Sequence, residues 1–301
     1  MPRCAPSASG CWRRPDRVIR LLGALLLAAA LTAAAAPAPA ADDHDFTAEV
    51  TGLPGKTWID LLSQIFPDIA PSSLDYATAS KLIDLRSIGA GDDSWVQCGD
   101  TIRFQDRDVR PVRLAGRNYF IVTVMIEDDC VGPLALFDAT GKLVDAVNVK
   151  GDQHVSFAGD YVRQLGADGA LVIASLWHDN SSQSYDISSL VLATPKGFSS
   201  IGDILALGSH ECGDGETHKP GELLQEESIV RVVPNGDPLA RIEAEVKRTV
   251  QKLDPEDCET TIGRPVRTSF SGYWRWNAAK KAYDAHITEL GVLADWTEKH
   301  F

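Results

Sequence analysis

Residues 109–126 read Val-Arg-Pro-Val-Arg-Leu-Ala-Gly-Arg-Asn-Tyr-Phe-Ile-Val-Thr-Val-Met-Ile. Two runs rich in apolar, β-branched and aromatic residues flank a short segment, Ala115 to Asn118, that contains a glycine. Such runs on either side of a glycine-containing turn are typical of a β-hairpin. The stretch therefore predicts two antiparallel strands, 109–114 and 119–126.

The same pattern recurs along the rest of the chain. Three further pairs of strand-like runs flank turn residues: 133–137 with 143–149, 190–193 with 198–207, and 272–276 with 282–287. Residues 98–301 are therefore predicted to form a mainly β antiparallel meander of hairpins. Segments 120–128 and 171–179 also share a pattern, and repeats of about 40–50 residues are typical of propeller blades. An irregular propeller-like array and a β-sandwich both remain open.

Helical character is predicted only near the start, in a lead-in over residues 57–90. Trp58, Leu61, Leu62 and Ile65 are spaced as on one face of a helix, which predicts an amphipathic helix over 57–66. The preceding segment, 52–57, contains part of a phosphate-binding loop but lacks its first glycine, so a turn that caps the helix is favoured. Residues 73–87 and 241–253 fit a helix or a strand.

The first 41 residues have the composition of a signal peptide. Residues 1–20 contain five arginines and one acid, residues 21–36 carry no charge, and small residues and prolines follow. These are the three parts of a secretory signal, and the apolar run is shorter than the roughly 20 residues of a membrane-spanning helix. We therefore expect residues 1–41 to be removed. The remaining 42–301 are predicted to form a single β-rich domain in the periplasm or outside the cell.

The composition of residues 42–301 is acidic. They carry 24 Lys and Arg against 41 Asp and Glu, a formal charge of −17. A surface of this sign repels nucleic-acid phosphates and anionic lipids. The sequence therefore predicts no nucleic-acid partner and no stable membrane insertion after the signal is removed, and no motif in it calls for a cofactor.

Four cysteines remain after residue 41, namely Cys98, Cys130, Cys212 and Cys258. An even number in an exported chain indicates disulfides. Three pairings are possible, and we favour Cys98–Cys130 with Cys212–Cys258 because each joins segments that are close in the sequence. Each would add roughly 3.5–4 kcal/mol in the loop-entropy model.

Five arginines fall within 15 residues: Arg103, Arg107, Arg110, Arg113 and Arg117. Guanidinium groups suit carboxylates, sulfates and phosphates. In a hairpin, Arg107, Arg113 and Arg117 are expected to share a face. We take Arg110, Arg113 and Arg117 as candidate binding residues for an anionic ligand or a protein partner. The alternative is an exposed strand whose arginines pair with the protein's own acids at little energetic gain.

Two other groups of residues suggest chemistry. Residues 210–218 contain two histidines, three acids and a cysteine. An unpaired Cys212 with His210 and His218 would suit zinc or copper, whereas a disulfide at Cys212, which we favour, would remove that site. Ser175, His178 and Asp179 contain the residue types of a hydrolase triad. On a regular strand, however, His178 faces away from the other two.

Two tryptophans near the end of the chain also allow two interpretations. Trp274 and Trp276 lie on one face of a predicted strand, as in a sugar platform, but their regular alternation with polar residues favours a half-buried core strand.

These patterns favour an exported, disulfide-stabilised, non-catalytic binding or interaction protein whose ligand the sequence does not identify. Two alternatives are retained. The first is a secreted hydrolase whose site is assembled from separate strand ends, for which a cleft holding His178 with His210 or His218 would be the sign. The second is a metal-handling protein that uses the 210–218 loop.

Overall fold

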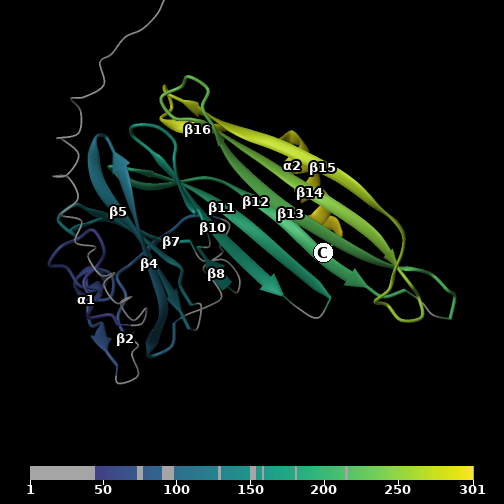
Figure 1. Ribbon diagram of the computed structural model, residues 1–301, viewed down its shortest axis with the longest axis horizontal. Coiled ribbons are helices and arrows are strands. Elements are labelled where there is room, and N and C mark those ends of the chain that lie inside the picture. Colours follow the sequence, from purple (N-terminus) through teal and green to yellow (C-terminus); the bar gives the residue numbers. More distant parts are fainter. Residues whose placement is uncertain are drawn as a thin grey trace, which may run out of the picture. The chain divides into compact units, whose positions relative to one another are not determined.

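The computed structural model describes residues 45–72, 77–89, 98–127, 130–149, 154–157, 159–179, 182–213 and 216–300, and the expected signal peptide lies outside these ranges. The described residues belong to one compact unit, Asp42–Phe301. Most of them are in β-strands, with two short helices (Figure 1). The mainly β fold predicted from the sequence is confirmed.

Seven strands form the first sheet, in the spatial order β1-β2-β4-β5-β6-β7-β3. Neighbouring strands are antiparallel except for β3 and β7, which are parallel. The strands are β1 Ala70–Pro71, β2 Ala77–Ala79, β3 Arg86–Ser87, β4 Ile102–Leu114, β5 Arg117–Ile126, β6 Pro133–Asp138 and β7 Leu143–Asn148.

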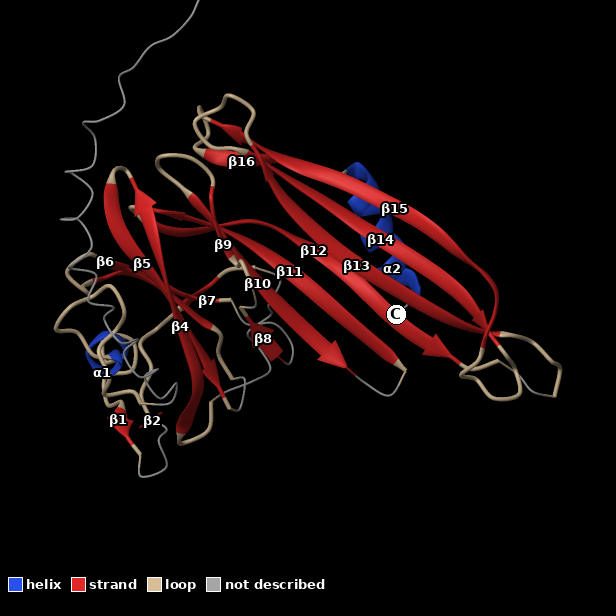
Figure 2. Cartoon of the chain, viewed as in Figure 1, coloured by secondary structure: helices blue, strands red, loops and turns tan. Residues whose placement is uncertain are grey.

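Nine strands form the second sheet, in the order β16-β15-β14-β13-β12-β11-β10-β8, with β9 paired to β10 beside β8 (Figure 2). All of its described pairings are antiparallel. The strands are β8 His154–Ser156, β9 Val162–Gln164, β10 Ala170–Asp179, β11 Gln183–Thr194, β12 Gly197–Glu211, β13 Gly221–Val233, β14 Arg241–Leu253, β15 Thr261–Asn277 and β16 Ala282–His286.

All four predicted hairpins are present, as β4–β5, β6–β7, β11–β12 and β15–β16. The first turn is tighter than expected. Leu114 pairs with Arg117, and Ala115 and Gly116 between them have φ of 50° and 75°. Positive φ at both central residues is the signature of a two-residue turn that matches the twist of the strands. The ambiguous segment 241–253 is strand β14.

The lead-in contains less helix than expected. Helix α1 spans Trp58–Leu62, and the following residues up to Asp68 form turns. Within these turns, the Gln64 side chain bonds the backbone of Gly141 and Leu143 in the neighbouring β6–β7 turn. The capping interpretation of residues 52–57 is confirmed, since Thr57 and Asp60 form a reciprocal capping box.

Three buried clusters hold the unit together. One face of each sheet contributes to a shared cluster that includes Ile121 and Leu136 of the first sheet and Val172 and Val191 of the second. Of the two arrangements that the sequence left open, two sheets packed over a common core agree with a sandwich. The segment around α1 covers the other face of the first sheet. Strand β5 is therefore buried on both faces, which explains its continuous apolar run.

A second helix, α2, spans Thr288–His300 and was not predicted. It contacts β15 and β12, and Leu290 and Leu293 are buried with Trp274 in the third cluster, on the outer face of the second sheet. The prediction that Trp274 belongs to the core is confirmed, because 1% of it is exposed. Neither described helix has the length and apolar character needed to cross a membrane.

Candidate functional site

The predicted arginine site does not converge on one face of the β4–β5 hairpin. The register pairs Arg113 with Asn118 and Arg117 with Leu114. Since side chains alternate along a strand, Arg113 lies on one face, whereas Arg117 and Arg110 lie on the other. Arg110 is also committed locally, because its Nε donates to Asp108 Oδ2 at 2.7 Å.

Arg107 has a structural role. Its guanidinium carbon lies 4.2 Å from the ring centroid of Phe46 and 4.9 Å from that of Trp58, and its Nη2 donates to the carbonyl oxygen of Asp45 at 2.7 Å. These contacts fasten the lead-in to β4. Arg107 shares a face with Arg113, so the expectation that Arg117 lies on the same face is wrong.

The structure contains both favoured disulfides, Cys98–Cys130 and Cys212–Cys258. The second changes the metal hypothesis. His210 Nε2 lies 2.7 Å from the carbonyl oxygen of Cys258, and a carbonyl only accepts hydrogen bonds, so this nitrogen carries the proton. His210, Cys212 and Cys258 form the one metal-compatible group among the described residues, and it does not include His218. With both sulfurs bonded to each other, it offers no thiolate ligand.

The hydrolase residues on β10 also remain apart. Ser175 pairs with Ser188 of β11, and the ring of His178 stacks on Tyr185 with centroids 5.1 Å apart. Residues 175 and 179 face one side of the strand and His178 faces the other. Among the hollows formed by described residues, His210 lines one and His178 lines none of the four. None of these four hollows is the cleft that would have favoured a hydrolase.

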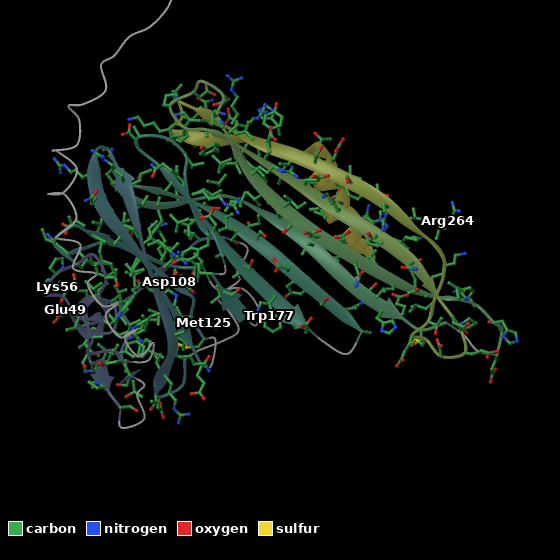
Figure 3. All side chains as sticks on the ribbon, in the orientation of Figure 1. Glu49, Lys56, Asp108, Met125, Trp177 and Arg264 are labelled. Carbon is green, nitrogen blue, oxygen red and sulfur yellow. A yellow bond between two sulfur atoms is a disulfide. The ribbon has the colours of Figure 1, made fainter. Side chains whose placement is uncertain are left out.

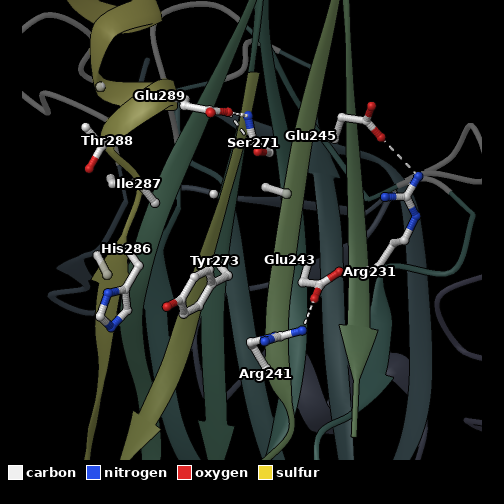
Figure 4. A pocket seen from close by; sticks show the side chains of 14 residues that line it. Arg231, Arg241, Glu243, Glu245, Ser271, Tyr273, His286, Ile287, Thr288 and Glu289 are labelled. Carbon is white, nitrogen blue, oxygen red and sulfur yellow. Dashed lines mark hydrogen bonds and ion pairs between the residues drawn. The ribbon is translucent and has the colours of Figure 1, made fainter. Parts of the chain in front are cut away.

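The largest of these four hollows, of about 960 Å³, lies at the β13–β16 side of the second sheet (Figure 4). Its charged groups pair with one another. Arg231 Nη2 lies 3.2 Å from Glu245 Oε2, and Arg241 pairs with Glu243 on the same strand. The hydrogen bond from Arg231 lowers the pKa of the Glu245 carboxyl. The charges of Arg231 and Arg241 are therefore neutralised by carboxylates of the same hollow.

The aromatic groups of this hollow are also stacked internally. The Tyr273 ring lies between His286, with centroids 4.6 Å apart, and the Arg241 guanidinium, 5.3 Å from its centroid. Glu289 accepts from both the backbone nitrogen and the hydroxyl of Ser271 at 2.8 Å, where β15 extends beyond the end of β16. We interpret this hollow as a structural network that stabilises the edge of the sheet.

A second set of hollows lies where the ladder of the second sheet narrows. Strands β12 and β13 pair over only four positions, from Gly208–Gln225 to Glu211–Glu222. Beyond these four positions, hydrogen bonds from side chains take the place of the backbone ladder. Glu226 Oε2 accepts from the backbone nitrogen of Leu207 at 3.0 Å, and Arg163 Nη1 donates to the carbonyl oxygen of Val230 at 2.6 Å. The strands separate here, and the space between them opens the sheet surface.

Three hollows of about 380, 460 and 250 Å³ adjoin one another along β10–β13. The first and second share Asp186 and Glu226, and the second and third share Asp179 and Gln225 in their linings. We call this continuous depression the β10–β13 groove. Its lining is polar and rich in hydroxyl groups, with Ser175, Ser188 and Ser228 in the first hollow.

Asp186 is the residue of the groove with an unsatisfied group. Its Oδ1 is buried and accepts no hydrogen bond from the described residues, and no cation pairs with its carboxylate. Burial alone raises the pKa of this carboxyl above its usual value. Buried polar atoms are nearly always hydrogen-bonded, so an exception asks for a partner such as a ligand or an ordered water.

Trp177 stands beside this carboxylate. The register places Trp177 of β10 directly opposite Asp186 of β11, and both line the second hollow. Trp177 is 39% exposed, and Figure 3 shows it towards the end of β10. Sequence reasoning did not single out Asp186 or Trp177. The sequence did contain a signal. Leu171, Ile173, Ser175 and Trp177 lie on one face of β10, and along this face the residues change from aliphatic to polar and aromatic.

The chain matches no protein-family model, no curated protein and no solved structure.

Proposed function

We propose that the chain is an exported, disulfide-stabilised and non-catalytic binding protein that takes its ligand in the β10–β13 groove. The observation that carries the proposal is the buried, unpartnered Oδ1 of Asp186 inside a continuous polar depression. Leaving such an atom unsatisfied costs about 1–3 kcal/mol. A ligand that donates to it would recover part of this free energy on binding.

The side chains of the groove support binding more than catalysis. A nucleophilic serine needs a base within hydrogen-bond reach. Ser188 Oγ instead lies 3.1 Å from Ser228 Oγ, and in the described structure neither these two nor Ser175 is hydrogen-bonded to a histidine. Glu226 is held by Arg248 and by the Leu207 backbone, so both of its oxygens are engaged. The groove supplies hydrogen-bonding groups on rigid strands.

Export is supported by the predicted signal in residues 1–41 and by the two disulfides, which are compatible with an oxidising compartment. A direct measurement is available. Expression of the full chain in a bacterial host followed by fractionation and N-terminal sequencing would locate the product and its first residue. We expect a product outside the cytoplasm that begins near residue 42, whereas an intact cytoplasmic chain would contradict export.

A second binding surface has one observation in its favour. Arg113 and Arg117 are exposed, and neither forms an ion pair among the described residues. With Arg110, they remain our candidate for contact with an anionic ligand or an acidic partner. Their positions on opposite faces of the hairpin make a single compact anion unsuitable, and an extended acidic partner around the hairpin end is the version we propose.

The two surfaces are separated by paired variants. Ser228→Tyr places a bulky ring in the first hollow of the groove, and the triple variant Arg110→Ala, Arg113→Ala, Arg117→Ala removes the hairpin charges. Calorimetric titration compares the variants, provided that each has an unchanged urea midpoint, and the probes are amines, neutral oligosaccharides and a polyglutamate peptide. We expect Ser228→Tyr to abolish binding and the triple variant to retain it. The reverse result would move the site to the hairpin and overturn the groove.

A further inference from the structure

The β10–β13 groove has a local chemistry that selects the sign of its ligand. Three carboxylate side chains face it, those of Asp179, Asp186 and Glu226, and Glu226 is paired with Arg248. Its cationic or titratable basic members are Arg163 and His210. Arg163 is engaged, because it donates to the carbonyl oxygens of Val230 and Asp160 and lies 3.6 Å from the Asp160 carboxylate. The groove is therefore electronegative, and this field attracts cations.

Within the groove, the pair formed by Asp186 and Trp177 combines two recognition elements for an ammonium group. Residues directly opposite on antiparallel strands have Cβ atoms about 4.5–5.5 Å apart, so one small group can touch both side chains. A carboxylate oxygen without a partner accepts an N–H bond, and the face of an indole attracts a cation. Trp177 is exposed enough to be reached from solvent.

A cation fits this carboxylate better than a neutral donor does. A sugar hydroxyl would satisfy the hydrogen bond of Asp186 Oδ1 but would leave the negative charge of this partly buried side chain uncompensated. No described side chain supplies that charge, since Arg163 and Arg248 are committed elsewhere. Burying an unpaired charge is unfavourable, and an ammonium group from outside would supply both the hydrogen bond and the opposite charge.

We propose that the β10–β13 groove binds an organic cation, with its ammonium group between the Asp186 carboxylate and the Trp177 indole. The inference rests on the proposed binding function and adds the ligand class. The adjoining hollows give room for an extended molecule with a further amino group, because Asp179 lines the second and third hollows. A linear polyamine has this chemistry.

The test uses the mature chain with spermidine as the cationic probe, maltotriose as a neutral probe and inorganic phosphate as an anion. Calorimetry at low salt measures affinity for Asp186→Asn and Trp177→Ala. Asp284→Asn is the matched control, because it removes the same charge from an exposed carboxylate that pairs with Lys280 outside the groove. We expect spermidine alone to bind, with roughly tenfold or greater loss in Asp186→Asn, a smaller loss in Trp177→Ala and no change in the control.

The outcomes separate the two proposals. If maltotriose binds, spermidine does not, and Ser228→Tyr abolishes the binding, the groove is a binding site and the cation inference is wrong. If spermidine binds with equal affinity to Asp186→Asn and Asp284→Asn, the attraction is a general effect of net charge and the inference is again overturned. If no probe of any sign responds to Ser228→Tyr, the proposed function itself fails. Thermal unfolding of each variant verifies that it is folded.

Discussion

Arg248 and Glu226 form a buried ion pair in which Nε and Oε1 are 2.6 Å apart, and 12% and 0% of their side chains are exposed. Glu226 also accepts from the Leu207 backbone, and the Arg248 guanidinium lies 3.9 Å from the ring centroid of Trp296. The pair thus connects β12, β13, β14 and α2 at the place where the β12–β13 ladder ends. It fixes the floor of the proposed groove.

Removing one partner of this pair should be strongly destabilising. In Glu226→Gln the guanidinium of Arg248 stays buried without its counter-charge, and such changes cost about 3–5 kcal/mol. Urea unfolding followed by circular dichroism measures the free energy. Lys280→Met is the control, because Lys280 and Asp284 form an exposed pair whose loss costs under about 1 kcal/mol. Equal losses of unfolding free energy in both variants would show that the buried pair stabilises the fold no more than the exposed pair does.

Replacing Asp186 should increase the stability of the protein at neutral pH, in contrast to replacing Glu226. Burial raises the pKa of its carboxyl in the folded state, so the folded protein holds this proton more tightly than the unfolded chain. Stability therefore falls as pH rises from the unfolded pKa through the folded one. Asp186→Asn removes this penalty, and the stability of the variant relative to the wild type should increase over that interval and then level off. Urea midpoints measured from pH 3 upwards test this.

Asp284→Asn provides a control of opposite sign. Hydrogen bonds from Asn277 and Lys280 lower the pKa of Asp284, so the wild type gains stability as pH rises through the folded pKa towards the unfolded value. The stability of the variant relative to the wild type should therefore decrease over that interval. If both variants showed the same pH trend, the environment that we assign to Asp186 would be wrong.

The hairpins were predictable because their signals are local. The two strands of the β4–β5 hairpin and the glycine between them are adjacent in the sequence, and the turn determines which residues pair. Strand β14 was not decided by its own sequence, since Ile242, Val246 and Val250 fit a helix or a strand. Its long ladders with β13 and β15 settle the choice. Helix α2 had a signal in the spacing of Leu290 and Leu293, which burial against Trp274 makes clear.

The groove could not be predicted for a different reason. Ser175, Ser188 and Ser228 lie on three strands, and they meet only because the register pairs residue 175 with 188 and because β13 departs from β12 after four positions. Neither the register nor the length of a ladder is encoded by one segment. The polar residues carry a visible pattern, but their convergence is a property of the assembled sheet.

The capping box of α1 offers a small and specific measurement. The Thr57 hydroxyl accepts from the Asp60 backbone nitrogen at 3.2 Å, and the Asp60 carboxylate accepts from the Thr57 backbone at 2.8 Å. Thr57→Ala should cost about 1 kcal/mol, whereas Thr57→Ser keeps the hydroxyl and should cost much less. Chemical denaturation of the two variants compares them. A similar loss in both would mean that the threonine methyl group, and not the cap, stabilises the segment.

The two disulfides should differ in their access to a reductant. Cys212 is exposed, whereas Cys130 is 6% exposed and packs in the core beneath the first sheet. Thiol–disulfide exchange requires a thiolate to reach a sulfur atom. Low concentrations of dithiothreitol should therefore open Cys212–Cys258 first, and alkylation followed by peptide mass spectrometry would identify which cysteines react.

Opening that disulfide should also loosen one end of the groove. Cys212 follows the last paired residue of β12, and His210 lines the third hollow while donating to the Cys258 carbonyl. The loop-entropy model gives a loss of about 4 kcal/mol for a loop of this length. Hydrogen exchange in Cys212→Ala, Cys258→Ala should rise first at β12–β13, because only four register pairs join these strands there. The matched variant Cys98→Ala, Cys130→Ala should leave hydrogen exchange at β12–β13 unchanged. If exchange at β12–β13 rose in this variant as well, the effect of Cys212–Cys258 would not be local.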